Sequence, residues 1–109
     1  MTDIVIVLTT VADDERAEPF ARELVDQGLA ACVNLYPPMV SVYRWKGRIE
    51  RETERQVVIK TTRARLNVLE AKLKSLHAYE LPEFAVISID SGSEAYLNWV
   101  RDQVESSAK

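Results

Sequence analysis

The chain has 109 residues, of which 47% are hydrophobic and 28% charged, a composition typical of a single globular domain covering residues 1–109. Fourteen basic and seventeen acidic side chains give a net charge of −3, which argues against a nucleic-acid partner. The sequence has no basic leader and no apolar run long enough to cross a bilayer, and its single cysteine cannot form an internal disulfide. We therefore expect a cytoplasmic protein that does not associate with membranes.

Residues 4–10 form a continuous apolar, β-branched run, which predicts a strand covered on both faces. The next segment predicts a helix that begins close to Pro19, because a proline inside a helix costs about 3 kcal/mol. One face of this helix collects the apolar side chains Ala17, Phe20, Ala21, Leu24 and Val25. Gly28 follows at the position where a helix C-terminal glycine is expected.

Residues 30–45 predict a second strand that is interrupted at Pro37 and Pro38, either by a bulge or by a break into two short strands, because proline cannot donate to a central ladder. Residues 45–48 predict a tight hairpin turn in which Gly47 supplies a positive φ. The returning strand is expected over residues 49–62.

The remaining chain predicts a helix over residues 64–77, a strand over 84–89 and a C-terminal helix that begins with a capping box from Ser91 to Glu94. The first of these helices carries an apolar stripe formed by Leu66, Leu69, Leu73 and Leu76. The last is expected to bury Tyr96, Leu97, Val100 and Val104. The order β-α-β-β-α-β plus a terminal helix predicts an α+β fold of the split β-α-β type.

The two hairpin strands are longer than a domain of this size needs. Alternation places Tyr43 and Trp45 on one face, and a row of carboxylates on one face of the returning strand, at Glu50, Glu52 and Glu54. Aromatic and arginine side chains are enriched at protein interfaces. The composition supports two readings equally: an interface with another chain, or a solvated hairpin whose charges prevent edge-to-edge aggregation.

His77 is the only histidine, so any imidazole metal site, or any general base that works at neutral pH, has to use it. Together with Glu80 or Glu83 it would supply nitrogen and oxygen ligands that suit Cu(II) or Zn(II). The alternative is that His77 hydrogen-bonds the last carbonyls of its helix. Cys32, among small apolar residues, is interpreted as a buried hydrophobe and not as a metal ligand.

Lys60 interrupts an apolar strand, and it is either an ordinary edge lysine or part of the rim of a pocket between subunits. Tyr79, Glu80 and Glu83 follow the neighbouring helix and would line the same pocket. The three glycines are scattered and form no phosphate-binding loop, and no second histidine supports a catalytic relay. We therefore predict that the chain is not an enzyme.

Four phrases in this order carry a resemblance that covers nearly the whole chain: LAACVN at 29–34, SVYRWKGRIE at 41–50, VIKTT at 58–62 and HAYELPE at 77–83. Together they resemble the CutA divalent-cation-tolerance family. The resemblance implies a ferredoxin-like homotrimer whose long hairpin binds the neighbouring subunit, which places Tyr43 and Trp45 at the trimer interface.

The copper ligands described in some members of that family are a cysteine late in the first strand and two adjacent histidines. The matching positions here are Thr9, Leu76 and His77, so one of the three ligands is retained, and Ala78 replaces a proline usual in the family. We expect a homotrimer that acts in tolerance of copper or another divalent cation, with His77 and Glu83 as candidate metal ligands. The alternative is a sensor or scaffold similar to PII-type signal transducers, with a small ligand in clefts between subunits.

Overall fold

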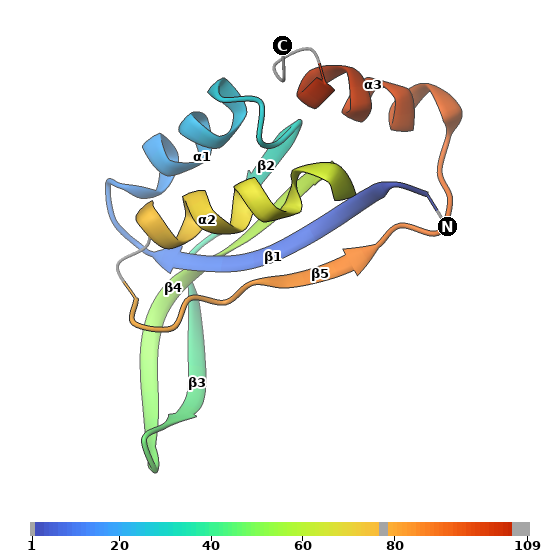
Figure 1. Ribbon diagram of the computed structural model, residues 1–109. Helices are drawn as coiled ribbons and strands as arrows, with labels where there is room; N and C mark the ends of the chain where they lie inside the picture. The colour runs from blue at the N-terminus through green and yellow to red at the C-terminus, as the bar shows by residue number, and fades with distance from the viewer. Residues whose placement is uncertain (1, 77–78, 106–109) are drawn as a thin grey trace.

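The computed structural model describes residues 2–76 and 79–105 of the chain. Five strands and three helices follow one another along the chain (Figure 1). Their bounds are β1 Ile4–Ala12, α1 Ala17–Asp26, β2 Cys32–Leu35, β3 Met39–Trp45, β4 Arg48–Thr62, α2 Leu66–Leu76, β5 Ala85–Ser88 and α3 Glu94–Glu105, with a 3-10 turn at Arg63–Arg65 before α2. No helix in these ranges is long and apolar enough to cross a membrane.

The strands form one antiparallel sheet in the order β2-β4-β1-β5, and β3 extends it by pairing with the first half of β4. This arrangement confirms the predicted α+β fold and its split β-α-β topology. Pairing in register places Ile6, Lys60 and Ile87 side by side on one face, and Val7, Ile59 and Val86 on the other.

Helices α1 and α2 cover one face of the sheet and build the main core there (Figure 1). Val7 and Ile59 from the sheet pack with Leu24 of α1 and Leu69 of α2, and all four side chains are fully buried. Each such burial stabilises the fold by about 1.5–3 kcal/mol. A smaller cluster joins α3 to the end of the sheet; its buried members are Ile4, Ala31, Leu97, Val100 and Val104.

Three predicted core positions are exposed: Val25 on α1, Leu76 at the end of α2 and Tyr96 on α3 are 45%, 38% and 42% exposed. The apolar stripe of each helix is therefore narrower than the sequence predicts. Tyr96 stacks instead on Trp99, with ring centroids 5.9 Å apart, at the surface of α3.

The start of α1 lies close to Pro19, as predicted, whereas the start of α3 differs from the prediction. Helix α1 begins at Ala17, so Pro19 lies in its first turn, where its missing N–H is no loss. Ser93, not Ser91, caps α3, because its Oγ accepts a hydrogen bond from the backbone N–H of Tyr96 at 3.3 Å.

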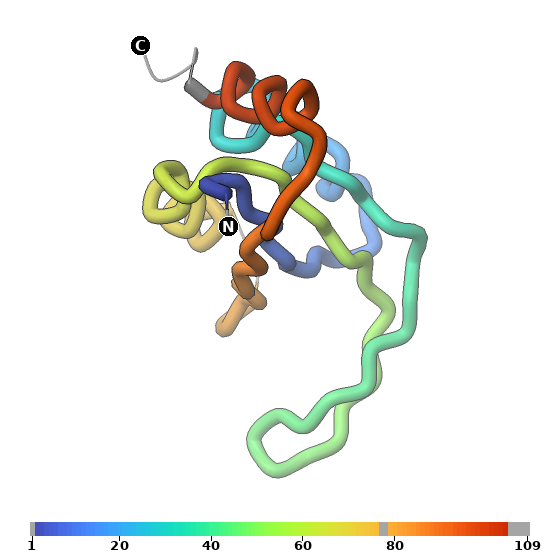
Figure 2. Tube along the Cα trace, turned by 90° about the vertical axis from the view of Figure 1, so that its right-hand side faces the viewer, coloured from blue at the N-terminus to red at the C-terminus, as the bar shows by residue number. Residues whose placement is uncertain are grey.

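The prolines do break the second predicted strand, which separates β2 from β3. Strand β3 and residues 48–54 of β4 then leave the body of the domain as a two-stranded projection, here called the arm (Figures 1 and 2). The turn at its tip has positive φ at Lys46 and Gly47, 51° and 80°, the backbone that a two-residue hairpin with a primed turn requires. The structure confirms Gly47 as the turn glycine and adds Lys46, which the sequence did not single out.

Candidate functional site

A cavity of about 730 Å³, here called the carboxylate pocket, lies between the arm and the segment that follows α2. Five glutamates line it, which are Glu50, Glu52, Glu54, Glu80 and Glu83. Three aromatic side chains complete most of the wall, which are Tyr43, Trp45 and Tyr79. The lining contains no lysine, arginine or histidine among the described residues.

Strand geometry explains why these side chains gather on one side of the arm. Successive side chains of a strand point to opposite faces, so Glu50, Glu52 and Glu54 share a face of β4. Tyr43 of β3 lies directly opposite Glu50, and paired residues project to the same side. The predicted row of carboxylates is confirmed, and the arm presents it to the pocket.

Glu54 is the most enclosed of the five carboxylates, since only 7% of the residue is exposed. Its Oε1 accepts a hydrogen bond of 3.0 Å from the hydroxyl of Tyr79. Burial and this bond to the carboxylate raise the pKa of the Tyr79 phenol well above its usual value of 10. None of the ion pairs of the described residues involves Glu54. The partner of its carboxylate is the Tyr79 phenol, which is uncharged.

Glu80 and Glu83, the two pocket glutamates that follow α2, lie nearer to solvent. Glu83 Oε2 accepts a hydrogen bond of 3.1 Å from Gln56 Nε2, and the same nitrogen donates to the backbone oxygen of Thr9 at 2.6 Å. Glu80 forms an ion pair with Lys46 of the arm tip at 3.4 Å, with both side chains about two-thirds exposed. Such an exposed pair contributes little to stability.

The negative charge of the pocket also affects the pKa of Tyr43. Desolvation and the neighbouring Glu52 carboxylate raise the pKa of its phenol. Two phenols from different segments, Tyr43 and Tyr79, thus have raised pKa values, first from desolvation and then from the glutamates beside them.

Lys60 lies elsewhere on the same face of the sheet and does not line the carboxylate pocket of one chain. Its Nζ donates to Oδ1 of Asn34, to which the Cys32 thiol also donates at 3.9 Å. Cys32 is half-buried in the single chain, so the expectation of a buried cysteine is wrong for one subunit. A role for Lys60 at the rim of an intersubunit pocket stays a prediction.

A preformed metal site is not found where the structure describes the chain. His77 and Ala78 lie outside the described residues, so the candidate pairing of His77 with Glu83 has no geometry here. Within residues 2–76 and 79–105, no three His, Cys, Asp or Glu side chains are arranged to hold a metal ion. The Thr9 hydroxyl is fully buried and has no hydrogen-bond partner among the described residues. The described residues by themselves therefore form no complete metal site.

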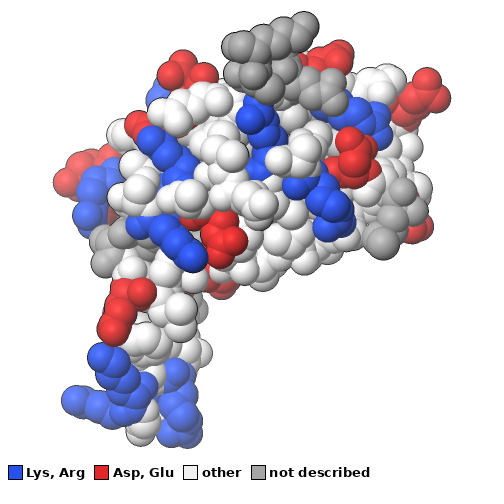
Figure 3. All heavy atoms as spheres, viewed as in Figure 1, with Lys and Arg blue, Asp and Glu red and all other residues white. Residues whose placement is uncertain are grey.

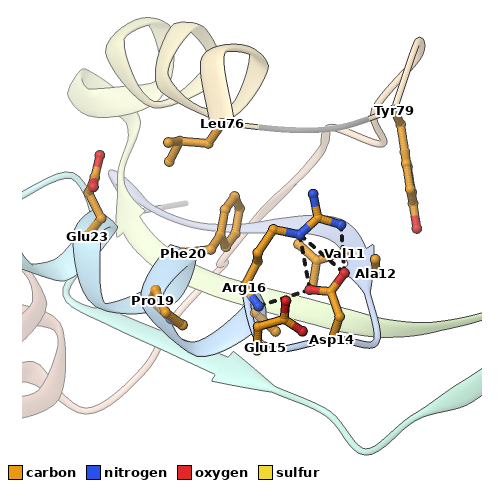
Figure 4. A pocket seen from close by; sticks show the side chains of 11 residues that line it. Val11, Ala12, Asp14, Glu15, Arg16, Pro19, Phe20, Glu23, Leu76 and Tyr79 are labelled. Atoms are coloured by element: carbon orange, nitrogen blue, oxygen red, sulfur yellow. Dashed lines mark hydrogen bonds and ion pairs between the residues drawn. The ribbon is translucent and has the colours of Figure 1, made fainter.

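A second, smaller cavity of about 460 Å³ lies between the start of α1 and the end of α2 (Figure 4). Phe20, Pro19 and Leu76 give it a mostly apolar wall. The Asp14 and Arg16 side chains at its edge bind each other at 2.6 Å, and this pair lowers the pKa of Asp14. Because Asp14 pairs with Arg16 and Glu23 pairs with Lys72, this cavity offers a ligand less polar chemistry than the carboxylate pocket.

Sequence reasoning missed that the carboxylate row, the aromatic pair of the arm and Tyr79 line one cavity. Taken alone, the row is typical of a solvated face that attracts cations only weakly. One sequence feature could have predicted this arrangement. Side chains alternate between the two faces of a strand, and across the hairpin turn Tyr43 and Trp45 fall on the same face as Glu50. No local pattern indicated that residues 79–83 fold back against that face.

Comparison with known proteins identifies the family of the whole chain. The family described as CutA1 divalent ion tolerance protein matches residues 5–103. This chain belongs to that family. It is 39% identical to the divalent-cation tolerance protein CutA of Thermus thermophilus over 97 residues, 89% of this chain and 94% of that protein. It spans only 54% of the human protein CutA.

Solved CutA structures share the fold over nearly the full length. CutA from Xylella fastidiosa superposes with a TM-score of 0.90 and 38% identity, covering 94% of this chain and 99% of that one. The protein described as PII-like CutA from Nostoc superposes with a TM-score of 0.86 and 37% identity, covering 92% of this chain and 96% of that one. The ferredoxin-like expectation drawn from the sequence resemblance is confirmed, and the predicted likeness to PII-type folds is supported.

Proposed function

We propose that this CutA chain acts as a cytoplasmic homotrimer in the tolerance of divalent cations, without catalysing a reaction. The family supports the link to divalent cations, since both its description and its Thermus member are named for that tolerance. The observation that supports assembly is the exposed apolar surface on the sheet and the arm.

That surface has two parts. The sheet face opposite α1 and α2 carries Ile6, Leu8 and Ile87, which are half-buried or exposed, whereas Val7 and Ile59 on the covered face are fully buried. The arm adds Val42 and Ile49, 66% and 70% exposed, and reaches well beyond the body of the domain. Exposed apolar side chains of this kind, here on two separate faces, mark protein interfaces.

The arm also carries a charge pattern that suits a partner chain. Its tip gathers basic side chains, whereas acidic side chains lie nearer its base (Figure 3). The tip residues are Arg44, Lys46 and Arg48, and Glu50 follows them toward the base. Complementary patches of opposite charge steer and orient association. Sedimentation should give about three times the chain mass of 12.4 kDa, whereas a mass of one chain at micromolar concentration would contradict the trimer.

A copper or other divalent-cation site in this proposal uses His77 with Glu83. Copper(II) titration of the native chain beside His77→Ala and Glu83→Gln tests it, with saturable binding expected only in the native chain. Equal binding in all three would remove this site from the proposal and leave the tolerance role without a direct metal contact.

A second candidate is a sensor or scaffold of the PII-like kind that binds a small ligand, and the carboxylate pocket favours it. The volume of about 730 Å³ is in the range of small-molecule sites and far larger than a metal ion requires. Tyr43 and Trp45 line this pocket from the arm, so a neighbouring subunit held by the arm would lie beside it. Stabilisation of the trimer by a small organic ligand, and not by copper, distinguishes this candidate.

The cytoplasmic location rests on the single cysteine, which gives the chain no internal disulfide. One solved relative, from Archaeoglobus fulgidus, is described as a periplasmic divalent cation tolerance protein. Cell fractionation of the native host tests the location, and recovery with the periplasmic fraction would overturn this part of the proposal.

A further inference from the structure

We infer that residues 79–83, here called the strap, hold the arm at a fixed angle to the body of the subunit and so control how readily the arm opens. The strap follows α2 and contacts the arm near its base and near its tip, on the side that carries the carboxylate pocket. The strap is a property of one chain, and its consequence for the exchange of subunits rests on the proposed assembly.

The arm has little support of its own. The pairing of β1 with β4 ends at Ala12 opposite Glu54, so beyond Glu54 the arm consists of two strands. Pro37 and Pro38 also separate β3 from β2, which belongs to the body. A two-stranded hairpin is marginally stable in water by itself, so the arm needs contacts with other parts of the molecule to keep one orientation.

The strap binds the base of the arm at two points. The Tyr79 hydroxyl donates to Oε1 of Glu54 at 3.0 Å, at the last residue pair that β4 shares with β1. Gln56 Nε2 donates to Oε2 of Glu83 at 3.1 Å and to the backbone oxygen of Thr9 at 2.6 Å. Because Glu54 is almost fully buried, leaving its carboxylate without the phenol is costly, and these contacts oppose movement of the arm about its base.

A third contact joins the strap to the tip of the arm. Lys46 Nζ, at the hairpin turn, lies 3.4 Å from Oε2 of Glu80. An ion pair as exposed as this contributes little to stability, so we expect the tip to open more readily than the base. The strap thus spans the arm from its buried end to its exposed end.

The test is hydrogen exchange of the backbone amides in the assembled protein. In Tyr79→Phe, the amides of the arm should exchange about tenfold faster than in the native chain, because the bond to a buried carboxylate is lost. Val100→Ala weakens the cluster under α3 and should speed the exchange of core amides while leaving the arm amides unchanged. Arm amides that respond equally to both variants, or to neither, would overturn the inference.

An exchange of charges separates the tip contact within one chain from a contact with a neighbouring chain. Lys46→Glu and Glu80→Lys each place like charges together, and each should speed the exchange of the tip amides by about twofold. The double variant restores opposite charges and should return to the native rates. A double variant that exchanges as fast as the single variants would show that Lys46 has a different partner, and would also overturn the inference.

Subunit exchange tests the consequence for assembly. Isotope-labelled and unlabelled proteins are mixed, and the mixed species are followed by mass spectrometry. Tyr79→Phe should exchange subunits faster than the native chain, whereas Tyr96→Phe, on the exposed side of α3, should exchange at the native rate. A native rate in Tyr79→Phe would remove the link between strap and assembly. A single-chain mass in sedimentation would overturn the proposed trimer, and amide exchange in the arm would still decide whether the strap acts within one chain.

Discussion

The Tyr79 hydroxyl lies 3.0 Å from Oε1 of Glu54, and this hydrogen bond joins the segment after α2 to the base of the arm. The two residues are 25 positions apart in sequence and belong to different elements of the fold. Because the carboxylate is almost fully buried, the bond stabilises both the enclosed charge and the position of residues 79–83 beside the pocket.

Tyr79→Phe removes the donor and keeps the ring. It should lower the free energy of unfolding by about 1–3 kcal/mol, because the Glu54 oxygen is left buried without its partner. Chemical denaturation at one fixed protein concentration measures this, since the stability of an oligomer depends on concentration. Tyr96→Phe, in an exposed tyrosine of α3, is the matched control and should change stability little. Equal effects in the two variants would contradict a structural role for the Tyr79–Glu54 bond.

Trp45→Ala tests the arm as an assembly device. Trp45 ends β3 at the arm tip, where a large aromatic side chain suits a buried contact with another chain. The variant should weaken self-association, so that sedimentation detects smaller species at low micromolar concentration. Val25→Ala removes an exposed apolar group from α1, away from the arm, and should leave the mass unchanged. A native mass in Trp45→Ala would argue that the arm does not hold the subunits together.

The order of strands and helices could be predicted because local signals agreed with the global fold. The break at Pro37 and Pro38 and the turn at Gly47 follow from backbone chemistry that tertiary contacts rarely override. The errors fall at helix faces and ends, where Val25, Leu76 and Tyr96 are exposed. The periodicity of apolar residues predicts which side of a helix is buried. The width of the buried stripe depends on the elements that pack against the helix, which the local sequence does not reveal.

The site was predicted in parts and not as a whole. Tyr79, Glu80 and Glu83 are expected beside Lys60 in a pocket between subunits, which stays a prediction. Within one chain they line a cavity whose other wall is the arm and whose lining does not include Lys60. Lys60 lies six residues along β4 from Glu54, which a strand extends over roughly 20 Å. Which end of β4 faces residues 79–83 depends on the tertiary fold, and no local pattern in the sequence contains it.

Thr9→Val should stabilise the protein by about 1 kcal/mol. The Thr9 hydroxyl is fully buried on the core side of β1 without a hydrogen-bond partner among the described residues, and burying such a group costs free energy. Valine has nearly the same shape and has no polar atom to bury. Thr53→Val, at an exposed position of the arm, serves as the control and should have little effect. Lower stability in Thr9→Val would mean that the hydroxyl has a role the contacts do not reveal.

Asp3→Asn tests the tie between the start of β1 and α3. Asp3 Oδ1 accepts hydrogen bonds of 2.8 Å from Arg101, and mainly this bond holds the pKa of Asp3 below 3.8, its usual value. A carboxyl group with a lowered folded-state pKa adds stability above its unfolded pKa and loses it as the pH falls through the folded value. Because the pair is partly exposed, its contribution at neutral pH is about 0.5 kcal/mol.

The variant should therefore be less stable than the native chain near pH 7, and the difference should shrink as the pH falls below about 3.8. Urea denaturation across that range measures it. Asp13→Asn, in the exposed loop before α1, is the control and should leave the curve close to that of the native chain. A difference that stays constant between pH 7 and pH 3 would show that the introduced amide disturbs packing and that the charge of Asp3 is not what joins β1 to α3.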